Sequence, residues 1–296
     1  IQNIFEPLKM LGNKIAMLQG AFTSIDRIFG ILNIEEYVEG NQKIDQLEGK
    51  IVFHDVNFRY QNNNPDNPLI LNDLNITFKA RESSAIVGAT GSGKSTIIKL
   101  ITKLYGKYEG SIKLDDQELK DISGKSLRKF ISVVPQEIVI FDGSISFNIG
   151  LDRIGVNQEM IEAAAKIVGA DNFINKLPGQ FDFIVREQGA NLSHGQKQLI
   201  VFARALSTNP PMVILDEATS SVDPNSEAMI QSAISSMMQN RTLIVIAHRL
   251  STIEECDNIL MIKSGSVIEQ GSHLQLMAQH GEYFHLNQSN TKSDSI

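Results

Sequence analysis

The sequence predicts an α/β protein whose central element is a parallel β-sheet flanked by helices. A short apolar run, Ser84–Val87, leads into a glycine-rich loop and then into a segment with the apolar spacing of a helix. In addition, four apolar runs each lead to a loop or a polar side chain, as expected when a parallel sheet carries its ligand site at the carboxyl ends of its strands. Apolar residues also alternate within 51–120, which predicts a partly antiparallel region beside that sheet.

Composition limits the classes of protein to consider. The 296 residues are 42% hydrophobic and 21% charged, as in ordinary globular proteins. The net charge of −7 argues against a nucleic-acid partner, which would call for a basic surface. The single cysteine, Cys256, excludes an internal disulfide and a zinc site built from cysteines. No run approaches 18 apolar residues, and we find no signal peptide.

The glycine-rich loop, Gly88–Thr96, fits the phosphate-binding pattern G-x-x-x-x-G-K-[ST] at every fixed position. Its glycines allow positive φ, so that backbone N–H groups can surround an anion. We expect Lys94 to reach the β- and γ-phosphates and the Ser95 hydroxyl to bind Mg²⁺. A glycine-rich turn with an incidental lysine is the alternative, and the flanking strand and helix count against it. The expected nucleotide-binding residues here are Gly88, Thr90, Gly91, Ser92, Gly93, Lys94, Ser95 and Thr96.

Four polar residues follow three further apolar runs, over 131–134, 213–215 and 243–247. Asp216 suits Mg²⁺, a cation that prefers oxygen ligands, and Gln136 could bind the metal or a water through its amide oxygen. Glu217 is the candidate general base for attack on a γ-phosphate, and His248 could hold that phosphate or the attacking water. Taken alone, a surface carboxylate pair or a structural histidine would explain such residues as well.

A second anion-binding element is predicted where Ser193 is followed three residues later by Gln196, the pattern of a capping box. The helix it opens is expected to extend through Leu206 and end before Asn209. Its free N–H groups suit a phosphate, although an ordinary capped helix has the same pattern.

Tyr60 is the candidate for binding the base of a nucleotide. It ends an apolar strand, with Val52, Val56 and Phe58 expected on the same face, and its ring could stack on adenine. A core or surface tyrosine is the alternative.

The N-terminal segment, 1–33, predicts an amphipathic helix with a break near Pro7. It could pack on its own domain or be the end of a helix from a neighbouring domain. The chain opens on Ile1, so we expect it to be part of something longer. Residues 39–50 are polar and read as a linker. The helical spacing rests on these residues: Ile4, Leu8, Leu11, Ile15, Leu18, Phe22, Ile25 and Phe29.

Together these motifs resemble the nucleotide-binding domain of an ATP-binding cassette (ABC) transporter of the exporter type, over residues 47–286. The similar segments come in the family's order: Gly88–Ser95 as the Walker A loop, Gln136 as the Q-loop, 213–216 with Glu217 as Walker B and the catalytic glutamate, 220–223 as the D-loop, and His248 as the switch histidine. Tyr60, 28 residues before Gly88, falls where the family's adenine-stacking aromatic belongs.

The segment Leu192–Gln196 resembles the family's LSGGQ signature, with His194 in place of the first glycine. In the family this segment binds the γ-phosphate held by the opposite subunit, through Ser193 and the amide of Gly195. The resemblance therefore implies a head-to-tail dimer around two ATP molecules. Because one chain carries every motif, we expect a homodimer, without excluding a heterodimer.

The resemblance implies an α/β P-loop NTPase with a RecA-like parallel sheet, an antiparallel β-subdomain and a helical subdomain over about 137–210. The expected parts are residues 1–46, the end of a missing transmembrane domain; 47–286, the nucleotide-binding domain; and 287–296, a disordered tail. Glu187 lies at the acidic position expected to touch the membrane domain. The expected activity is MgATP hydrolysis that powers translocation, at the cytoplasmic face of an inner or plasma membrane.

Two other functions are compatible with the sequence. A non-transport ABC ATPase, such as a DNA-repair or translation factor, would add coiled coils or pair two cassettes in one chain, and neither is visible. A nucleotide-gated switch with little turnover is suggested only by His194.

Overall fold

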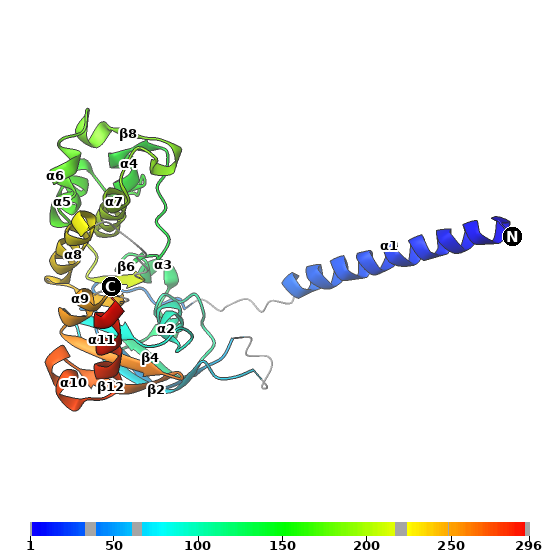
Figure 1. Ribbon diagram of the computed structural model, residues 1–296, viewed down its shortest axis with the longest axis horizontal. Coiled ribbons are helices and arrows are strands. Elements are labelled where there is room, and N and C mark those ends of the chain that lie inside the picture. The colour runs from blue at the N-terminus through cyan, green and yellow to red at the C-terminus, as the bar shows by residue number, and fades with distance from the viewer. Residues whose placement is uncertain (1, 33–39, 61–66, 217–223, 248, 294–296) are drawn as a thin grey trace. The chain divides into compact units, whose positions relative to one another are not determined.

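The computed structural model describes residues 2–32, 40–60, 67–216, 224–247 and 249–293. It divides into two compact units, Ile1–Val38 and Glu39–Ile296. Figure 1 shows the elements of both units.

The first unit is one helix, α1 (Gln2–Leu32), and its apolar side chains are exposed, including Phe22 at 63% and Phe29 at 55%. The expected break near Pro7 is wrong, because the helix continues through that residue. Pro7 lies close to the start of α1, where only about one turn of helix precedes it and few hydrogen bonds are at stake. Within the described ranges, no helix is long and apolar enough to cross a membrane.

The second unit is built on a six-stranded sheet in which β6, β9, β10, β3 and β11 run parallel and β12 pairs antiparallel with β11. This confirms the predicted parallel sheet. Along the sheet the strands follow the order β12 (Ser266–Gly271), β11 (Asn258–Lys263), β3 (Ser83–Val87), β10 (Thr242–Ile246), β9 (Met212–Asp216) and β6 (Ile131–Val134).

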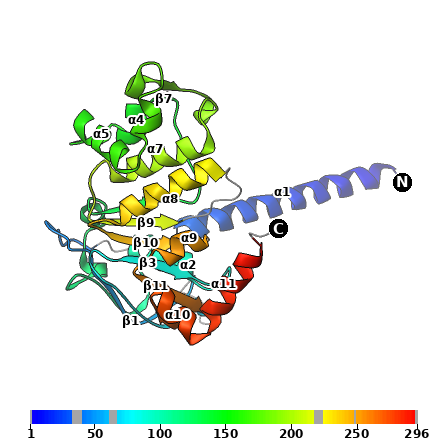
Figure 2. The same cartoon turned by 60° about the vertical axis from the view of Figure 1, so that its left-hand side comes forward.

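Alternate residues of the central strands belong to two different cores. On β3, Ala85 and Val87 join the core shared with the helical region, whereas Ile86 joins the core on the other face. Side chains of a strand point to opposite faces in turn, so a fully apolar run means burial on both faces. Figure 2 shows α7 (His194–Leu206) and α8 (Pro224–Met238) packed on one face of this sheet.

The opposite core is covered by α2 (Lys94–Ile101) and a second sheet, which is antiparallel with the order β2-β1-β4-β5. The predicted antiparallel region is therefore confirmed. Its strands are β1 (Ile51–Phe58), β2 (Leu71–Phe78), β4 (Glu109–Leu114) and β5 (Gln117–Glu118). The predicted buried face of β1 is wrong in part, because Phe53 rather than Val52 is buried together with Val56. The pairing of β1 with β2 shifts register between Phe53 and Val56, where Asp55 has φ +49°.

The helical part groups around α7 at one end of this unit (Figure 1). Its other elements are α4 (Ile145–Gly150), α5 (Gln158–Ile167), α6 (Asp171–Ile174) and the small hairpin of β7 (Gly143–Ser144) and β8 (Ile184–Val185). The remaining helices are α3 (Gly124–Leu127), α9 (Leu250–Glu254), α10 (His273–Gln279) and α11 (Glu282–Ser293).

The end of the chain differs from the disordered tail that we expected from Asn287 onward, because α11 extends through Ser293. The helix is held at its base, where Tyr283 is fully buried and its hydroxyl lies 2.8 Å from Nδ1 of His273. Asn287 is also buried, at 7% exposure. These long-range contacts stabilise a polar segment whose composition alone predicts no structure.

Candidate nucleotide-binding site

The phosphate loop joins the buried strand β3 to α2, and its glycines take conformations that other residues avoid. Gly88 has φ +149° and Gly93 has φ +109°. A Cβ on Gly88 would overlap the carbonyl of Ile262, and one on Gly93 would lie 2.8 Å from Leu71. Local backbone freedom and close packing both require glycine at these positions.

Lys94 folds back over the loop that precedes it. Its Nζ donates hydrogen bonds to the carbonyl oxygens of Gly88, at 2.7 Å, and Ala89, at 3.0 Å. Burial lowers the pKa of Lys94, and the carboxylate of Asp216 opposes part of that shift. The loop thus holds a desolvated positive charge at the start of α2, where an anion is also favoured by the helix dipole.

A cleft of about 420 Å³ opens beside the loop, and most of the predicted site residues line it. This volume falls in the range of small-molecule sites, roughly 300–1,000 Å³. Asp216, the last residue of β9, and Gln136, two residues after β6, line the same cleft, as expected for the carboxyl ends of parallel strands. The predicted residues brought together are Tyr60, Thr90, Gly91, Gly93, Lys94, Ser95, Thr96, Gln136 and Asp216.

The donor set fits a magnesium ion bound with a polyphosphate. Ser95, Gln136 and Asp216 supply hydroxyl, amide and carboxylate oxygens to one cleft, and Mg²⁺ takes oxygen ligands from few side chains when phosphates supply the rest. Among the described side chains, no group of three or more His, Cys, Asp or Glu forms a self-sufficient metal site.

Tyr60 is anchored to the loop and to other aromatic rings. Its hydroxyl lies 2.9 Å from Oγ1 of Thr96, and its ring meets Phe58 and Tyr105 edge to face, with centroids 5.1 and 5.2 Å away. Nζ of Lys99 lies 5.5 Å from the ring centroid. We did not predict Tyr105 or Lys99 from the sequence, because the contacts join segments far apart and leave no local pattern.

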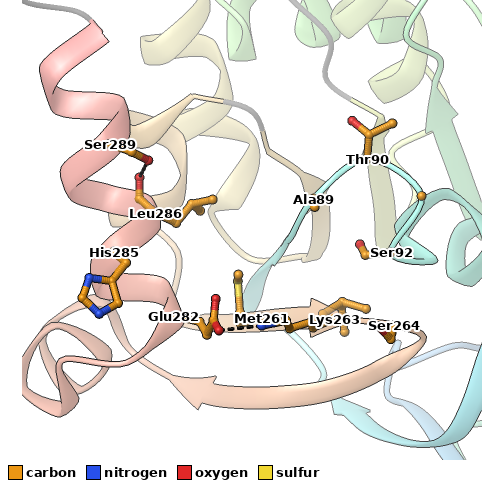
Figure 3. A pocket seen from close by; sticks show the side chains of 12 residues that line it. Ala89, Thr90, Ser92, Met261, Lys263, Ser264, Glu282, His285, Leu286 and Ser289 are labelled. Carbon is orange, nitrogen blue, oxygen red and sulfur yellow. Dashed lines mark hydrogen bonds and ion pairs between the residues drawn. The ribbon is translucent and has the colours of Figure 1, made fainter.

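Ser92 does not line the cleft; it lines a second cavity, of about 480 Å³, together with residues of β11 and α11 (Figure 3). Its hydroxyl oxygen is buried and has no hydrogen-bond partner among the described residues. Its carbonyl accepts a hydrogen bond from the N–H of Gly265, which ties the loop to the β11–β12 hairpin. Across the cavity, Lys263 pairs with Glu282 at 2.6 Å and so joins that hairpin to α11.

The predicted capping box at the start of α7 is confirmed. The Gln196 N–H donates to Oγ of Ser193 at 3.2 Å, and the Ser193 N–H donates to the Gln196 side chain at 2.9 Å. Ser193 and His194 are exposed. Gly195 is buried against α8, where an added Cβ would lie 2.8 Å from Cβ of Ser226. In both cartoons α7 lies in the helical part, on the opposite side of the parallel sheet from α2 (Figures 1 and 2).

Several other predicted site residues are not among those that the structure describes. Glu217, His248 and the segment 220–223 lie outside the described residues. The strands that lead toward them, β9 and β10, end at the cleft, since Asp216 and Ile246 both line it. Glu187 is exposed beside β8, at a turn where its φ is +49°.

Comparison with known proteins gives the family. Residues 71–220, about half of the chain, match the family described as ABC transporter. The chain belongs to this family. It is therefore an ABC nucleotide-binding domain, a P-loop NTPase that binds ATP, as the sequence predicted.

Relatives of this ABC domain point to exporters rather than to the non-transport alternatives. The chain is 42% identical over 286 residues to an "ATP-dependent lipid A-core flippase" of Yersinia pestis, matching 96% of this chain and 49% of that protein. It is 38% identical to "ABC transporter B family member 6" of Dictyostelium discoideum, over 97% of this chain and 44% of the relative.

A solved structure of a bacterial Atm1-family ABC exporter with ATP bound is also similar, with a TM-score of 0.76 and 34% identity over 98% of this chain and 51% of that one. The chain thus spans about half the length of the relatives that it matches.

Proposed function

We propose that this chain binds and hydrolyses MgATP and that two copies acting together drive transport across a membrane. The observation that carries the proposal is the single cleft in which the loop, Lys94, Ser95, Gln136 and Asp216 converge. Groups from three strand ends and one helix start meet there, at the carboxyl edge of the parallel sheet.

Each group has a role that follows from its chemistry. The loop amides and Lys94 hold the phosphates, and Ser95, Asp216 and Gln136 offer oxygens to Mg²⁺. The ion neutralises charge that develops on the transferred phosphoryl group. Glu217 activates the attacking water, and His248 holds the γ-phosphate.

A second copy supplies the remaining phosphate contacts. The start of α7 offers free N–H groups, yet α7 packs on one face of the sheet, while α2, which follows the phosphate loop, packs on the other (Figure 2). A head-to-tail homodimer brings the Ser193 hydroxyl and Gly195 amide of one copy to the ATP held by the other. The exposed His194 then lies at the interface between the two copies.

Transport is proposed from the relatives. An exporter and a flippase share this domain in about half of their length, so we assign the other half of a comparable protein to the membrane and place this domain at its cytoplasmic face. The exposed apolar surface of α1 suits a helix that continues into such a part. The transported molecule is selected there.

The test is ATP-dependent dimer formation by the Glu217→Gln variant. We expect this variant to bind MgATP, to release almost no phosphate and to accumulate as a dimer in size-exclusion chromatography with light scattering. Glu159→Gln, at an exposed position of α5, is the matched control and should behave as the wild type. Normal phosphate release by Glu217→Gln would remove that residue from its role, and a chain that neither binds ATP nor pairs would refute the whole proposal.

A further inference from the structure

A third cavity, of about 600 Å³, lies at the amino ends of β9 and β10, opposite the edge that carries the nucleotide cleft. It forms where the loop after α7 and the loop after α8 enter these two strands. Its polar lining comes from Asn209 on the first loop and from Ser236, Gln239, Asn240 and Arg241 at the end of α8. The volume suits a small molecule.

Arg241 is the distinctive group of this cavity. The residue is only 9% exposed, and its Nη1 is buried without any hydrogen-bond partner among the described residues. Its Nε reaches the carbonyl of Gln239 at 3.5 Å, the outer limit of a hydrogen bond. Burial lowers the pKa of Arg241, and no nearby carboxylate opposes the shift in the part of the chain that the structure describes.

A buried guanidinium whose Nη1 has no partner and whose Nε makes one long hydrogen bond is incompletely paired, which is unfavourable in a protein interior. Arginine carries five N–H donors and no acceptor, and burying its charge costs free energy that an acceptor with opposite charge would recover. Asp and Glu are absent from the cavity lining, all of whose residues are described. A ligand that enters the cavity could therefore neutralise the charge of Arg241.

The surrounding groups favour an anion. Asn209, Gln239 and Asn240 bring side-chain amides, which can donate hydrogen bonds, and no second charge lines the described cavity. Ser236 already donates to the carbonyl of Ser232 at 2.9 Å. Among the described residues, the carbonyl that accepts from Nε of Arg241 is that of Gln239, just after α8, and at 3.5 Å it offsets the charge only weakly.

From this cavity and the incompletely paired guanidinium of Arg241 we infer a second ligand site, which binds a small oxyanion, a carboxylate or a phosphate, by charge-assisted hydrogen bonds to Arg241. The planar guanidinium matches both groups with paired hydrogen bonds. The site is separate from the nucleotide cleft and does not depend on the proposed ATPase cycle.

The test is isothermal titration of the full 296-residue chain with inorganic phosphate and, separately, with acetate, at constant ionic strength set with chloride. Wild-type protein is compared with Arg241→Gln and with Ser236→Glu, which adds a carboxylate to the lining of the cavity that Arg241 also lines. Anions bound at the phosphate loop contribute equally to all three proteins, so the difference reports the Arg241 site. The better of the two anions defines the ligand class.

We expect both variants to bind the preferred anion at least about tenfold more weakly at this site than wild type. Ser236→Glu should also raise the melting temperature by about 2–4 °C, because its carboxylate pairs with the buried charge. Equal binding of both anions by wild type and Ser236→Glu would overturn the inference and leave Arg241 solvated by water. If Arg241→Gln does not fold, the Ser236→Glu comparison decides alone.

Discussion

Replacing Lys94 with methionine should change both the affinity for ATP and the stability of the nucleotide-free protein, because the buried charge of Lys94 affects each of them. Two of the three Nζ protons already bond to the carbonyls of Gly88 and Ala89, at 2.7 and 3.0 Å, so one proton remains for a phosphate. A hydrogen bond to a charged group contributes about 1.5–3 kcal/mol, and about 1.4 kcal/mol changes a dissociation constant tenfold. Lys94→Met should therefore weaken ATP binding by about 10- to 150-fold.

The same variant should be more stable than wild type when no nucleotide is bound. Lys94 is 7% exposed, and burial lowers its pKa despite the nearby Asp216. A lysine with a lower pKa in the folded state binds fewer protons there than in the unfolded state, so stability rises with pH as the pH moves from the folded pKa toward the ordinary value of 10.5. Below the pKa of Lys94 in the folded state, the full free-energy cost of burying its charge is present, and Lys94→Met removes this cost.

Both effects can be measured on one preparation. Titration calorimetry gives the ATP affinity, and urea unfolding without nucleotide gives the stability from pH 7 upward, with Lys113→Met on the exposed side of β4 as the control. We expect the rise of stability with pH to be smaller in Lys94→Met than in the control. Unchanged ATP affinity, or a less stable free protein, would show that the loop carbonyls and not a phosphate are the main partners of Lys94.

Three further predictions concern single side chains. Tyr60→Phe should bind ATP as the wild type does, whereas Tyr60→Leu should lose about 1–3 kcal/mol of stacking, measured by calorimetry. Gly195→Ala should destabilise the fold by about 1–3 kcal/mol, because its Cβ would lie 2.8 Å from Cβ of Ser226, and adding Ser226→Gly should recover most of that loss in urea unfolding. Burial raises the pKa of Tyr283 to about 12, so wild-type stability should fall between pH 10.0 and about 12, and Tyr283→Phe should lack this decrease.

Patterns that are local in sequence predicted the parallel sheet and the motifs. An apolar run such as 213–215 is buried on both faces, so its length and its polar end locate a strand of a parallel sheet. The capping box of Ser193 and Gln196 depends on a spacing of three residues and forms as expected. The cleft follows, because parallel strands deliver their last residues to one edge.

Features that depend on contacts between segments far apart in the sequence were either not predicted or predicted wrongly. The bulge near Asp55 changes which residues of β1 are buried, and alternation alone gives no sign of it. The extension of α11 rests on the buried Tyr283 and Asn287, whose partners lie on other elements. Ser92 belongs to the motif but lines the second cavity rather than the cleft, because the motif depends on the backbone N–H groups of the loop and not on the side chain at that position.

The start of α7 offers a direct test of the two-copy site. Ser193→Asp retains the helix cap, since Asp caps about as well as Ser, and adds a carboxylate that repels a phosphate. Ser272 opens α10 with the same type of capping box, so Ser272→Asp is a matched control with no expected effect on ATP hydrolysis. Phosphate release by Ser193→Asp alone should fall to near background.

Mixing Ser193→Asp with Lys94→Met then shows whether one site draws on two chains. In a head-to-tail dimer, a mixed pair has one site that carries both changes and one site that carries neither. With random pairing about half of the dimers are mixed, so the mixture should recover about a quarter of wild-type phosphate release if the sites turn over independently. If each site used the loop and the α7 start of the same chain, no site in the mixture would be intact, and activity no higher than that of either variant alone would refute the head-to-tail arrangement.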